Sequence, residues 1–491
     1  MKGCIYNQSL ALLTDLYELT MSYGYWKKKL HDKETVFHLF FRRLPFQGGF
    51  VIAAGLENLS HFLQNFKFHT SDIDFLSTLK GNDGLPLFEK DFLHYLQKMN
   101  FTCDVDAVPE GTAVFPYEPL LRIRGPLMQC QLLESACLNY INFPSLIATK
   151  AARICIAAQG DSVLEFGLRR AQGLDGALTA SRSAYIGGCD ATSNALAGKI
   201  FDIPVKGTHA HSWVMIFDDE LASFRAYAQV MPNNCVFLVD TYNTIEGVKN
   251  AIKVGRELKK HNKKMLGIRL DSGDLAYLSI ESRKMLDKAG FQDAFIIGSN
   301  ELDETIISDL KAQGAQIAVW GVGTNLITAK NCPSLDGVYK ISAIKDEKKG
   351  WQRKIKLSEQ MAKISNPGIL QIHRYSRKKE YRADIIYDEE IGLLNNQTIV
   401  DPLDSTRRKF LPKEMKGKDL LRPIFREGKL VYMLPPLEEI RKKTQKELAM
   451  FHSGIKRFIH PHQYVVGMEE TLYNLKIDLI KKARGTSKPS K

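Results

Sequence analysis

One stretch in the middle of the chain decides the fold class: residues 265–274, which read MLGIRLDSGD. An apolar run suited to a buried strand passes there directly into polar and turn-forming residues. The same form recurs in three more runs, which begin at residues 235, 295 and 317 and end in DTY at 240–242, SNE at 299–301 and GVGT at 321–324. Segments with helical spacing fill the gaps, at 245–258, 275–286 and 302–310. This alternation predicts βα units around a parallel sheet.

The sequence on either side of this region adds further predicted strands and shows where the pattern ends. Two upstream runs, 163–167 and 203–207, resemble further strands, and 338–344 would be the last strand. A repeat of roughly 22 to 30 residues suits a barrel as well as an open sheet. Residues 1–150 mix helical segments with short strands broken by prolines, which is α+β in character. We therefore predict three domains: an N-terminal domain at 1–150, a parallel α/β domain at 151–345 and a basic C-terminal domain at 346–491.

Composition excludes several classes of protein. The 491 residues are 44% hydrophobic and 25% charged, which excludes disorder as the dominant state. No apolar run approaches the roughly 18 residues that cross a bilayer, and residues 1–10 show no secretory leader, so we expect a cytoplasmic protein without a membrane partner. The eight cysteines form no C-x-x-C pair, which argues against a zinc ribbon and fits reduced thiols.

The net charge of +13 is concentrated in the last third of the chain. Residues 340–491 hold 34 basic and 19 acidic side chains, whereas residues 1–339 hold 34 and 36. Such an excess is typical of a solvated lysine-rich surface, and it lacks the interleaved aromatic residues of a nucleic-acid stacking platform. We expect no nucleic-acid partner, although binding of RNA or DNA by this third is an alternative.

The polar residues that follow the strands are the candidate site, because the carboxyl ends of parallel strands meet at one face of a sheet. Arg269 precedes Asp271 by two residues, so both lie on one side of the strand, and a buried arginine there would pair with an anion such as an aromatic carboxylate. Asp271 and Asp274 suit a magnesium ion or ribose hydroxyls. The segment DSGD at 271–274 is also typical of a turn, and an aspartate or serine at the end of a strand can simply cap the helix that follows.

A glycine loop and a histidine pair add two further motifs. Gly321 and Gly323 leave room for backbone N–H groups to close on a phosphate, to which Ser299 and Asn300 could also donate. His209 and His211 have metal-ligand spacing but need further ligands, so a histidine at this strand end is a better candidate for a nucleophile or an acid/base group.

Several of these segments, taken in order, resemble the nicotinate phosphoribosyltransferase family. The matching stretches are TDLYELTM (14–21), FRRLP (41–45) with GL (55–56), EFGLRRAQG (165–173), GTHAHS (207–212), DTY (240–242), GIRLDSGD (267–274), SN (299–300) and GVGT (321–324). The resemblance runs from about residue 10 to residue 345, and the C-terminal third matches only loosely.

The resemblance implies an α/β fold, specifically an irregular α/β barrel beside an N-terminal α/β domain, with a C-terminal extension and assembly as a homodimer. It implies ATP-dependent formation of nicotinate mononucleotide from nicotinate and 5-phosphoribosyl 1-pyrophosphate, the first step of NAD salvage from nicotinate, with Mg²⁺ as the cofactor. The nicotinate-binding residues would be Tyr17, Arg169, Thr208 and Arg269. The catalytic residues would be His211, which ATP would phosphorylate, with Asp240, Asp271 and Asp274, the last two also binding the metal. The 5′-phosphate would lie on Ser299, Asn300, Gly321, Gly323 and Thr324.

Two other enzymes stay open as alternatives. The sister enzyme that uses nicotinamide would need an acceptor for the amide N–H groups near the ring. An unrelated barrel enzyme acting on sugar phosphates would share the glycine loop but would not need Tyr17 or His211.

Overall fold

The computed structural model describes residues 10–393, 398–404, 406–412 and 415–485. Residues 1–9, where we expect no leader, lie outside this range. The chain forms two compact units: the first joins residues 1–146 to 334–491, and the second is 147–333. Each unit is described by itself below.

The second unit is built on a parallel sheet of six strands in the order β7-β6-β11-β10-β9-β8. The strands are β6 (Ser162–Glu165), β7 (Ala191–Thr192), β8 (Cys235–Leu238), β9 (Met265–Leu270), β10 (Phe295–Gly298) and β11 (Val319–Val322). They are nearly continuous apolar runs, as expected of parallel strands that are buried on both faces. Because β7 and β8 are the two edges, the row stays open over the described residues, and the predicted irregular barrel is confirmed as a curled half-barrel.

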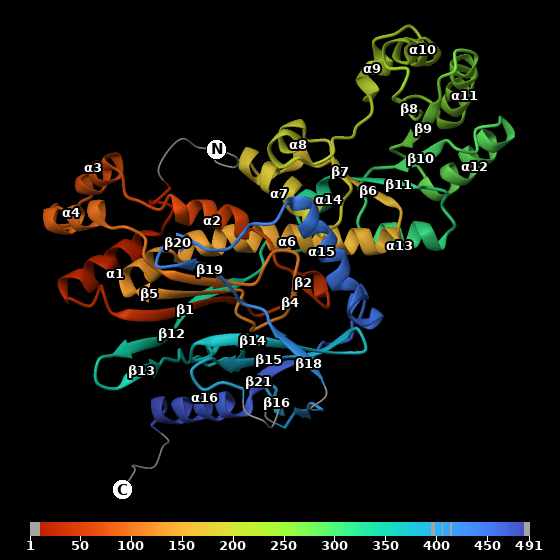
Figure 1. The fold of residues 1–491 in the computed structure, drawn as a ribbon. Helices are drawn as coiled ribbons and strands as arrows, with labels where there is room; N and C mark the ends of the chain where they lie inside the picture. Colours follow the sequence, from red (N-terminus) through yellow and green to blue (C-terminus); the bar gives the residue numbers. More distant parts are fainter. Residues whose placement is uncertain (1–9, 394–397, 405, 413–414, 486–491) are drawn as a thin grey trace. The chain divides into compact units, whose positions relative to one another are not determined.

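Helices connect these strands. They are α7 (Leu174–Gly187), α8 (Ala195–Phe201), α9 (His211–Met215), α10 (Glu220–Val230), α11 (Thr244–Lys260), α12 (Leu275–Lys288), α13 (Glu304–Ala312) and α14 (Thr324–Ile327), with a 3₁₀ turn, η2, at Leu168–Arg170. In Figure 1, α11, α12 and α13 lie along one side of β8 to β11. The helices predicted at 245–258, 275–286 and 302–310 are therefore confirmed as α11, α12 and α13.

Two of the predicted strands differ from the structure. In the run 203–207 only Val205 pairs, through an isolated parallel bridge to Thr192. The run 338–344 was expected to end the barrel, which is wrong: it is part of β12 (Gly337–Asp346) in the first unit and pairs antiparallel with β1 (Glu34–Phe41). The physical reason is contact with residues distant in sequence, because the Tyr339 ring is buried at 5.1 Å from Phe37 and its hydroxyl donates to the Cys130 carbonyl at 2.7 Å.

The first unit contains three sheets. The seven-stranded sheet has the order β13-β12-β1-β5-β3-β19-β20, the six-stranded sheet has the order β17-β16-β21-β15-β14-β18, and β2 pairs with β4. The remaining strands are β2 (Val51–Ile52), β3 (Asp104–Ala107), β4 (Ala113–Val114), β5 (Leu121–Pro126), β13 (Gly350–Arg353), β14 (Leu370–Arg377), β15 (Glu380–Asp388), β16 (Thr398–Val400), β17 (Arg408–Phe410), β18 (Lys416–Asp419), β19 (Arg422–Arg426), β20 (Lys429–Leu430) and β21 (Val466–Glu469). The helices are α1 (Leu16–Lys27), α2 (Leu56–Gln64), α3 (Thr70–Thr78), α4 (Lys90–Lys98), α5 (Leu127–Leu132), α15 (Leu437–Ala449) and α16 (Glu470–Ala483), while α6 (Glu134–Ala158) continues past the unit boundary at residue 146.

The C-terminal third shares a core with the N-terminal residues. Strand β19 pairs with β3, and five residues from the last third join the main apolar core of the first unit: Ile372, Leu420, Leu421, Ile424 and Phe425. The predicted division at 150 and 345 lies close to the boundaries of the second unit, but 346–491 and 1–146 form one unit in the structure. Whether 346–491 folds as a separate domain stays a prediction.

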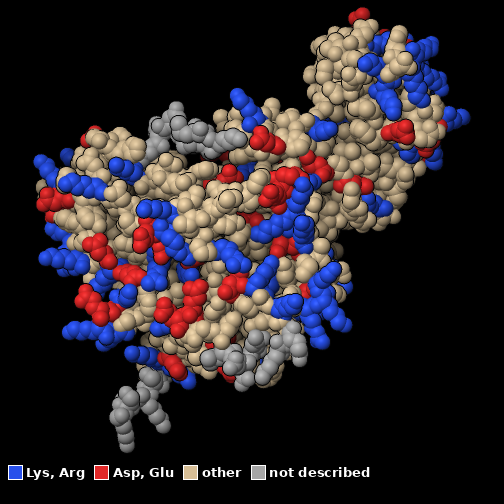
Figure 2. Space-filling model, viewed as in Figure 1, with Lys and Arg blue, Asp and Glu red and all other residues tan. Residues whose placement is uncertain are grey.

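Surface charge on the first unit is mixed. In Figure 2, lysine and arginine are interspersed there with aspartate and glutamate. Several cations of the last third are ion-paired, such as Arg353 with Asp388 at 3.0 Å. Among the described residues, no helix is long and apolar enough to cross a membrane.

Candidate active site

The site is formed where β8, β9 and β10 end. These strands are parallel neighbours, with Leu270 of β9 opposite Gly298 of β10, so the residues that follow them stand side by side. Asp271 and Ser299 therefore meet, and the Ser299 N–H donates to the Leu270 carbonyl at 2.9 Å. The polar residues that follow these strands therefore meet at one rim of the sheet because the strands are parallel neighbours.

Arg269 is the centre of this cluster. Its side chain is 13% exposed, and the guanidinium donates to Ser299 Oγ at 2.9 Å, Thr208 Oγ1 at 3.1 Å and Asp271 Oδ1 at 2.9 Å. The guanidinium carbon lies 5.6 Å from the centre of the Phe166 ring. A guanidinium carries five N–H groups, so these three contacts leave two without a partner among the described residues.

Three carboxylate oxygens of the cluster differ in their environment. Burial by itself raises the pKa of Asp271, but the Arg269 guanidinium and the Ser299 hydroxyl outweigh it and hold that pKa below its ordinary 3.8. Asp240 Oδ2 accepts from the Asp271 N–H at 2.8 Å and from Ser272 Oγ at 2.6 Å. Asp240 Oδ1 is buried without a hydrogen-bond partner in the part of the chain that the structure describes. An unsatisfied carboxylate oxygen of this kind is suited to a cation or a hydroxyl donor.

The two histidines of the H-x-H pair are separated by the fold. His211 begins α9, is 40% exposed, and places Nδ1 at 3.1 Å from Thr241 Oγ1 and Nε2 at 3.7 Å from Asp271 Oδ2. His209 is buried, and its Nε2 accepts the Leu238 N–H at 3.2 Å. Burial lowers the pKa of His209 to about 4, so it is neutral at pH 7. The pair therefore does not chelate one ion, and no group of three or more ligating side chains that could hold a metal occurs among the described residues.

The glycine loop follows β11. A Cβ at Gly321 would lie 2.7 Å from atoms of the Phe166 ring, so only glycine fits beside that ring. Gly323 precedes the short helix α14, which begins at Thr324. Asn300 has φ 116°, a left-handed backbone conformation that is strained for a residue with a side chain and that recurs at functional sites.

Other predicted residues have different surroundings. Asp274 caps α12, because its Oδ1 accepts the Tyr277 N–H at 3.0 Å. Arg169 is exposed on the turn η2, and Tyr17 lies on α1 of the first unit with 46% of its surface exposed. The structure thus brings together Thr208, His211, Asp240, Arg269, Asp271 and Ser299 within the second unit.

Phe166, Thr241 and Ser272 contact this cluster but were not singled out from the sequence. All three lie inside the segments that match the family, and Thr241 and Ser272 directly follow Asp240 and Asp271. Phe166 could have been suspected because it is an aromatic residue near the end of the predicted strand 163–167, where side chains lie at the rim of the sheet.

Three family models match the chain in succession. They are the nicotinate phosphoribosyltransferase N-terminal domain over residues 12–142, the nicotinate phosphoribosyltransferase family over 162–367 and the C-terminal domain over 370–476. The similarity thus extends well beyond residue 345, where it was expected to end.

Curated relatives and solved structures agree with these models. The chain is 42% identical to a nicotinate phosphoribosyltransferase from Bacillus subtilis, over 96% of each protein, and 34% identical to the human one, over 94% of this chain and 95% of that one. The crystal structure of human nicotinic acid phosphoribosyltransferase superposes with a TM-score of 0.82 at 31% identity, over 95% of this chain and 99% of that one. A nicotinate-nucleotide pyrophosphorylase from Pyrococcus furiosus shares the fold at 22% identity, with a TM-score of 0.67 over 92% of this chain and 99% of that one.

Proposed function

The chain belongs to the nicotinate phosphoribosyltransferase family, and on that premise we propose that it joins nicotinate to 5-phosphoribosyl 1-pyrophosphate. The pyridine nitrogen attacks C1 of the ribose, the bond from C1 to the pyrophosphate oxygen breaks, and the products are nicotinate mononucleotide and pyrophosphate. The observation that supports this best is the Arg269 guanidinium, held at the strand ends with two N–H groups left over.

Arg269 distinguishes an acid from an amide. Its two remaining N–H groups can donate to one carboxylate, a charge-assisted contact that contributes about 1.5–3 kcal/mol. Arginine has no acceptor, so it cannot satisfy the N–H₂ of nicotinamide. The nearest carboxylate, Asp271, already accepts from Arg269 and Ser299. This favours nicotinate over the amide as the substrate.

The ribose and its phosphate would lie along the same rim. We assign the 5′-phosphate to the backbone of Gly323 and Thr324 and to Asn300, because a phosphate can approach backbone N–H groups closely where a side chain is absent. Gly321 is less suited than expected, since the space beside it is filled by the Phe166 ring. Ser299 is less suited to this role than expected, since its N–H and its hydroxyl both donate within the protein. No strong base is required, because the pyridine nitrogen attacks with a lone pair and loses no proton.

The residues present fit a magnesium ion in part. Asp240 offers a buried carboxylate oxygen without a partner, and Asp271 keeps its second oxygen outside the pair with Arg269. Bound there, Mg²⁺ would neutralise charge on the departing pyrophosphate. Asp274 fits less well, because it caps α12. The carboxylates at the rim would themselves stabilise the positive charge that develops on the ribose as C1 loses its leaving group.

His211 is suited to accept a phosphoryl group from ATP. Its exposed ring is held by Thr241 and stands 3.7 Å from Asp271, so a phosphate there would add about two negative charges beside the cluster. The homodimer and the cytoplasmic location stay predictions that rest on the family.

The His211→Ala variant tests the role of ATP. We expect the variant to form product at the rate that the wild type shows without ATP, and ATP to give no further stimulation. Rates with and without ATP at fixed nicotinate measure this, and undiminished stimulation would rule the role out.

The function itself is tested by product analysis. Purified protein is incubated with phosphoribosyl pyrophosphate, Mg²⁺, ATP and either nicotinate or nicotinamide. The nucleotide products are separated and identified by mass spectrometry. We expect nicotinate mononucleotide, together with pyrophosphate in equal amount. Formation of the amide nucleotide instead would identify the sister enzyme.

A further inference from the structure

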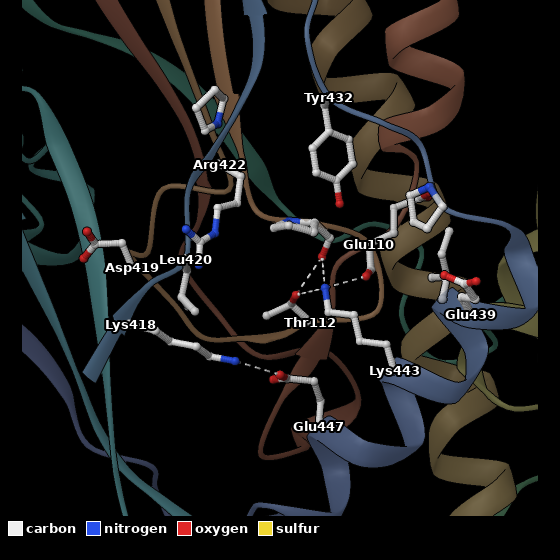
Figure 3. Close-up of a pocket in the computed structure, with 14 residues that line it drawn as sticks. Glu110, Thr112, Lys418, Asp419, Leu420, Arg422, Tyr432, Glu439, Lys443 and Glu447 are labelled. Atoms are coloured by element: carbon white, nitrogen blue, oxygen red, sulfur yellow. Dashed lines mark hydrogen bonds and ion pairs between the residues drawn. The ribbon is translucent and has the colours of Figure 1, made fainter. Parts of the chain in front are cut away.

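The first unit holds a cavity of about 580 Å³ that the proposed reaction does not use. It lies between the loop after β3, strands β18 and β19, and α15 (Figure 3). Prolines 109, 423 and 435 line its walls together with Leu420, Ile440 and Tyr432. A cavity of this size holds a small organic molecule, and apolar walls with a few polar groups are typical of such sites.

Lys443 of α15 places its amine in this cavity. Its Nζ donates to the Pro109 carbonyl at 3.2 Å, the Glu110 carbonyl at 2.9 Å and Thr112 Oγ1 at 2.7 Å. All three acceptors are neutral. Within the described residues, no carboxylate lies within ion-pair distance of this nitrogen, which is unusual for a largely buried lysine.

The charges around Lys443 do not offset its burial. Glu447 already accepts from Arg374 at 3.2 Å and from Lys418 at 3.3 Å, and the Glu110 carboxylate accepts the Gly55 N–H at 2.6 Å. Burial therefore lowers the pKa of Lys443 to about 8, with Lys418 and Arg374 adding to the effect of burial and Glu447 and Glu110 opposing it. A desolvated lysine of this kind is still mostly protonated at pH 7, but its uncharged, nucleophilic fraction is far larger than that of an ordinary lysine and grows through about pH 8.

The opposite wall of the cavity is cationic. Arg422 is exposed, and among the described residues no carboxylate forms an ion pair with its guanidinium. In Figure 3 the Tyr432 hydroxyl is directed toward the space in front of Lys443, and the Arg422 side chain, which also lines the cavity, runs toward Leu420. Asp419 also lines the cavity, but its carboxylate accepts from His373 at 2.7 Å and Tyr387 at 3.2 Å. Glu439 is the remaining acid at the rim.

We propose that this cavity is a covalent binding site for small aldehydes that carry an anionic group, with Lys443 as the amine and Arg422 as the partner of the anion. The Nζ lone pair forms a bond to the carbonyl carbon, the amine loses two protons, and the carbonyl oxygen leaves with them as water, giving an imine. The uncharged amine has two N–H groups and gives up its bond to the Pro109 carbonyl, the longest of the three. The imine has no N–H, so the bonds to the Glu110 carbonyl and to Thr112 are given up as it forms.

The neighbouring lysine provides a matched comparison. Lys442 lies one residue away on the same helix, is 60% exposed and pairs with Glu438 at 3.3 Å. It has the ordinary surroundings of a surface lysine, so it reports the rate at which any exposed amine of this helix would react. Selective reaction at Lys443 can therefore be measured within one protein.

Labelling of the full-length protein with pyridoxal 5′-phosphate tests the site. The imine is reduced with borohydride, and the modified peptides are quantified by mass spectrometry at pH 7.5. We expect Lys443 to be labelled at least tenfold faster than Lys442, with a rate that rises through about pH 8. The Lys443→Arg variant should lose this label while Lys442→Arg keeps it, and the thermal unfolding temperature of each variant shows that it is folded.

The anion is tested separately. Pyridoxal, which lacks the phosphate, and the Arg422→Ala variant should each reduce labelling of Lys443 several-fold. Equal labelling by pyridoxal and by its phosphate would overturn the assignment of Arg422. If Lys443 is labelled no faster than Lys442, the proposed site as a whole is overturned. Lys443 then has only a structural role, through its hydrogen bonds from α15 to the loop 109–112.

Discussion

Ser299 shows how one hydroxyl helps to orient Arg269, the residue to which we assign the nicotinate carboxylate. It accepts from Arg269 Nε at 2.9 Å, donates to Asp271 and is 2% exposed. The sequence singled it out as a phosphate donor because it follows a strand. Its actual partners depend on β9 and β10 being neighbours and on its rotamer, and neither can be read from composition or periodicity.

Removing this hydroxyl should weaken nicotinate binding. We expect Ser299→Ala to raise KM for nicotinate about tenfold, because a lost hydrogen bond to a charged group costs about 1.5 kcal/mol or more, with a smaller change in KM for phosphoribosyl pyrophosphate. Steady-state kinetics with each substrate varied in turn measure this. Ser308→Ala is the control, since that hydroxyl donates only to the Glu304 carbonyl within α13. Equal effects on both substrates would argue against a positioning role.

His209 supports the site by staying uncharged. Its Nε2 accepts the Leu238 N–H, a bond that only the neutral ring can make. Its folded-state pKa of about 4 lies below the ordinary 6.5, so between these values the unfolded chain binds more protons than the folded one. Stability from this group is therefore complete above about pH 6.5 and is lost as the pH falls toward 4.

The pH dependence of unfolding measures this effect. Relative to His209→Gln, the wild type should lose about 2 to 3 kcal/mol of unfolding free energy between pH 6.5 and pH 4, from a shift of about 2.5 units at 1.36 kcal/mol each, discounted for partial exposure. His38, which accepts the Leu370 N–H, is present in both proteins and cancels in the difference. Parallel pH profiles for the two proteins would contradict the assignment.

At the scale of elements, α11 is held against the end of β8 by a close approach. The Gly247 position has no room for a side chain, because a Cβ there would lie 2.1 Å from the Val239 carbonyl oxygen. The outer face of α11 carries Lys249, Lys253 and Lys260, all exposed. The apolar spacing predicted the helix and its buried face, but not the contact with the backbone that Gly247 permits.

Alanine at this position should strain the contact between helix and strand. We expect Gly247→Ala to lower the free energy of unfolding by about 2 kcal/mol, within the range for overpacking a core. Gly176→Ala in α7 is the matched control, because nothing lies within 4 Å of a Cβ there, and it should be neutral or slightly stabilising. Chemical denaturation of the three proteins compares them. A Gly247→Ala variant as stable as the control would contradict the close packing.

At the scale of the whole molecule, the chain forms part of the first unit, then the second unit, and then returns to complete the first. The βα units at 235–324 could be predicted because each strand and helix is continuous in sequence and has its own apolar period. The return could not be predicted. The run that became β12 is as apolar as a barrel strand, and only its pairing with β1 assigns it to the other unit. Pairing between distant segments leaves no local signal.

The central claim is that Arg269, held at the strand ends of the second unit, selects an acid as the substrate. The most direct test is the ratio of kcat/KM for nicotinate to that for nicotinamide, in the wild type and in Arg269→Ala. We predict that the wild type prefers nicotinate, and that the variant loses ten- to a hundredfold in kcat/KM for nicotinate with little change for nicotinamide. A variant that keeps the wild-type preference would contradict the account.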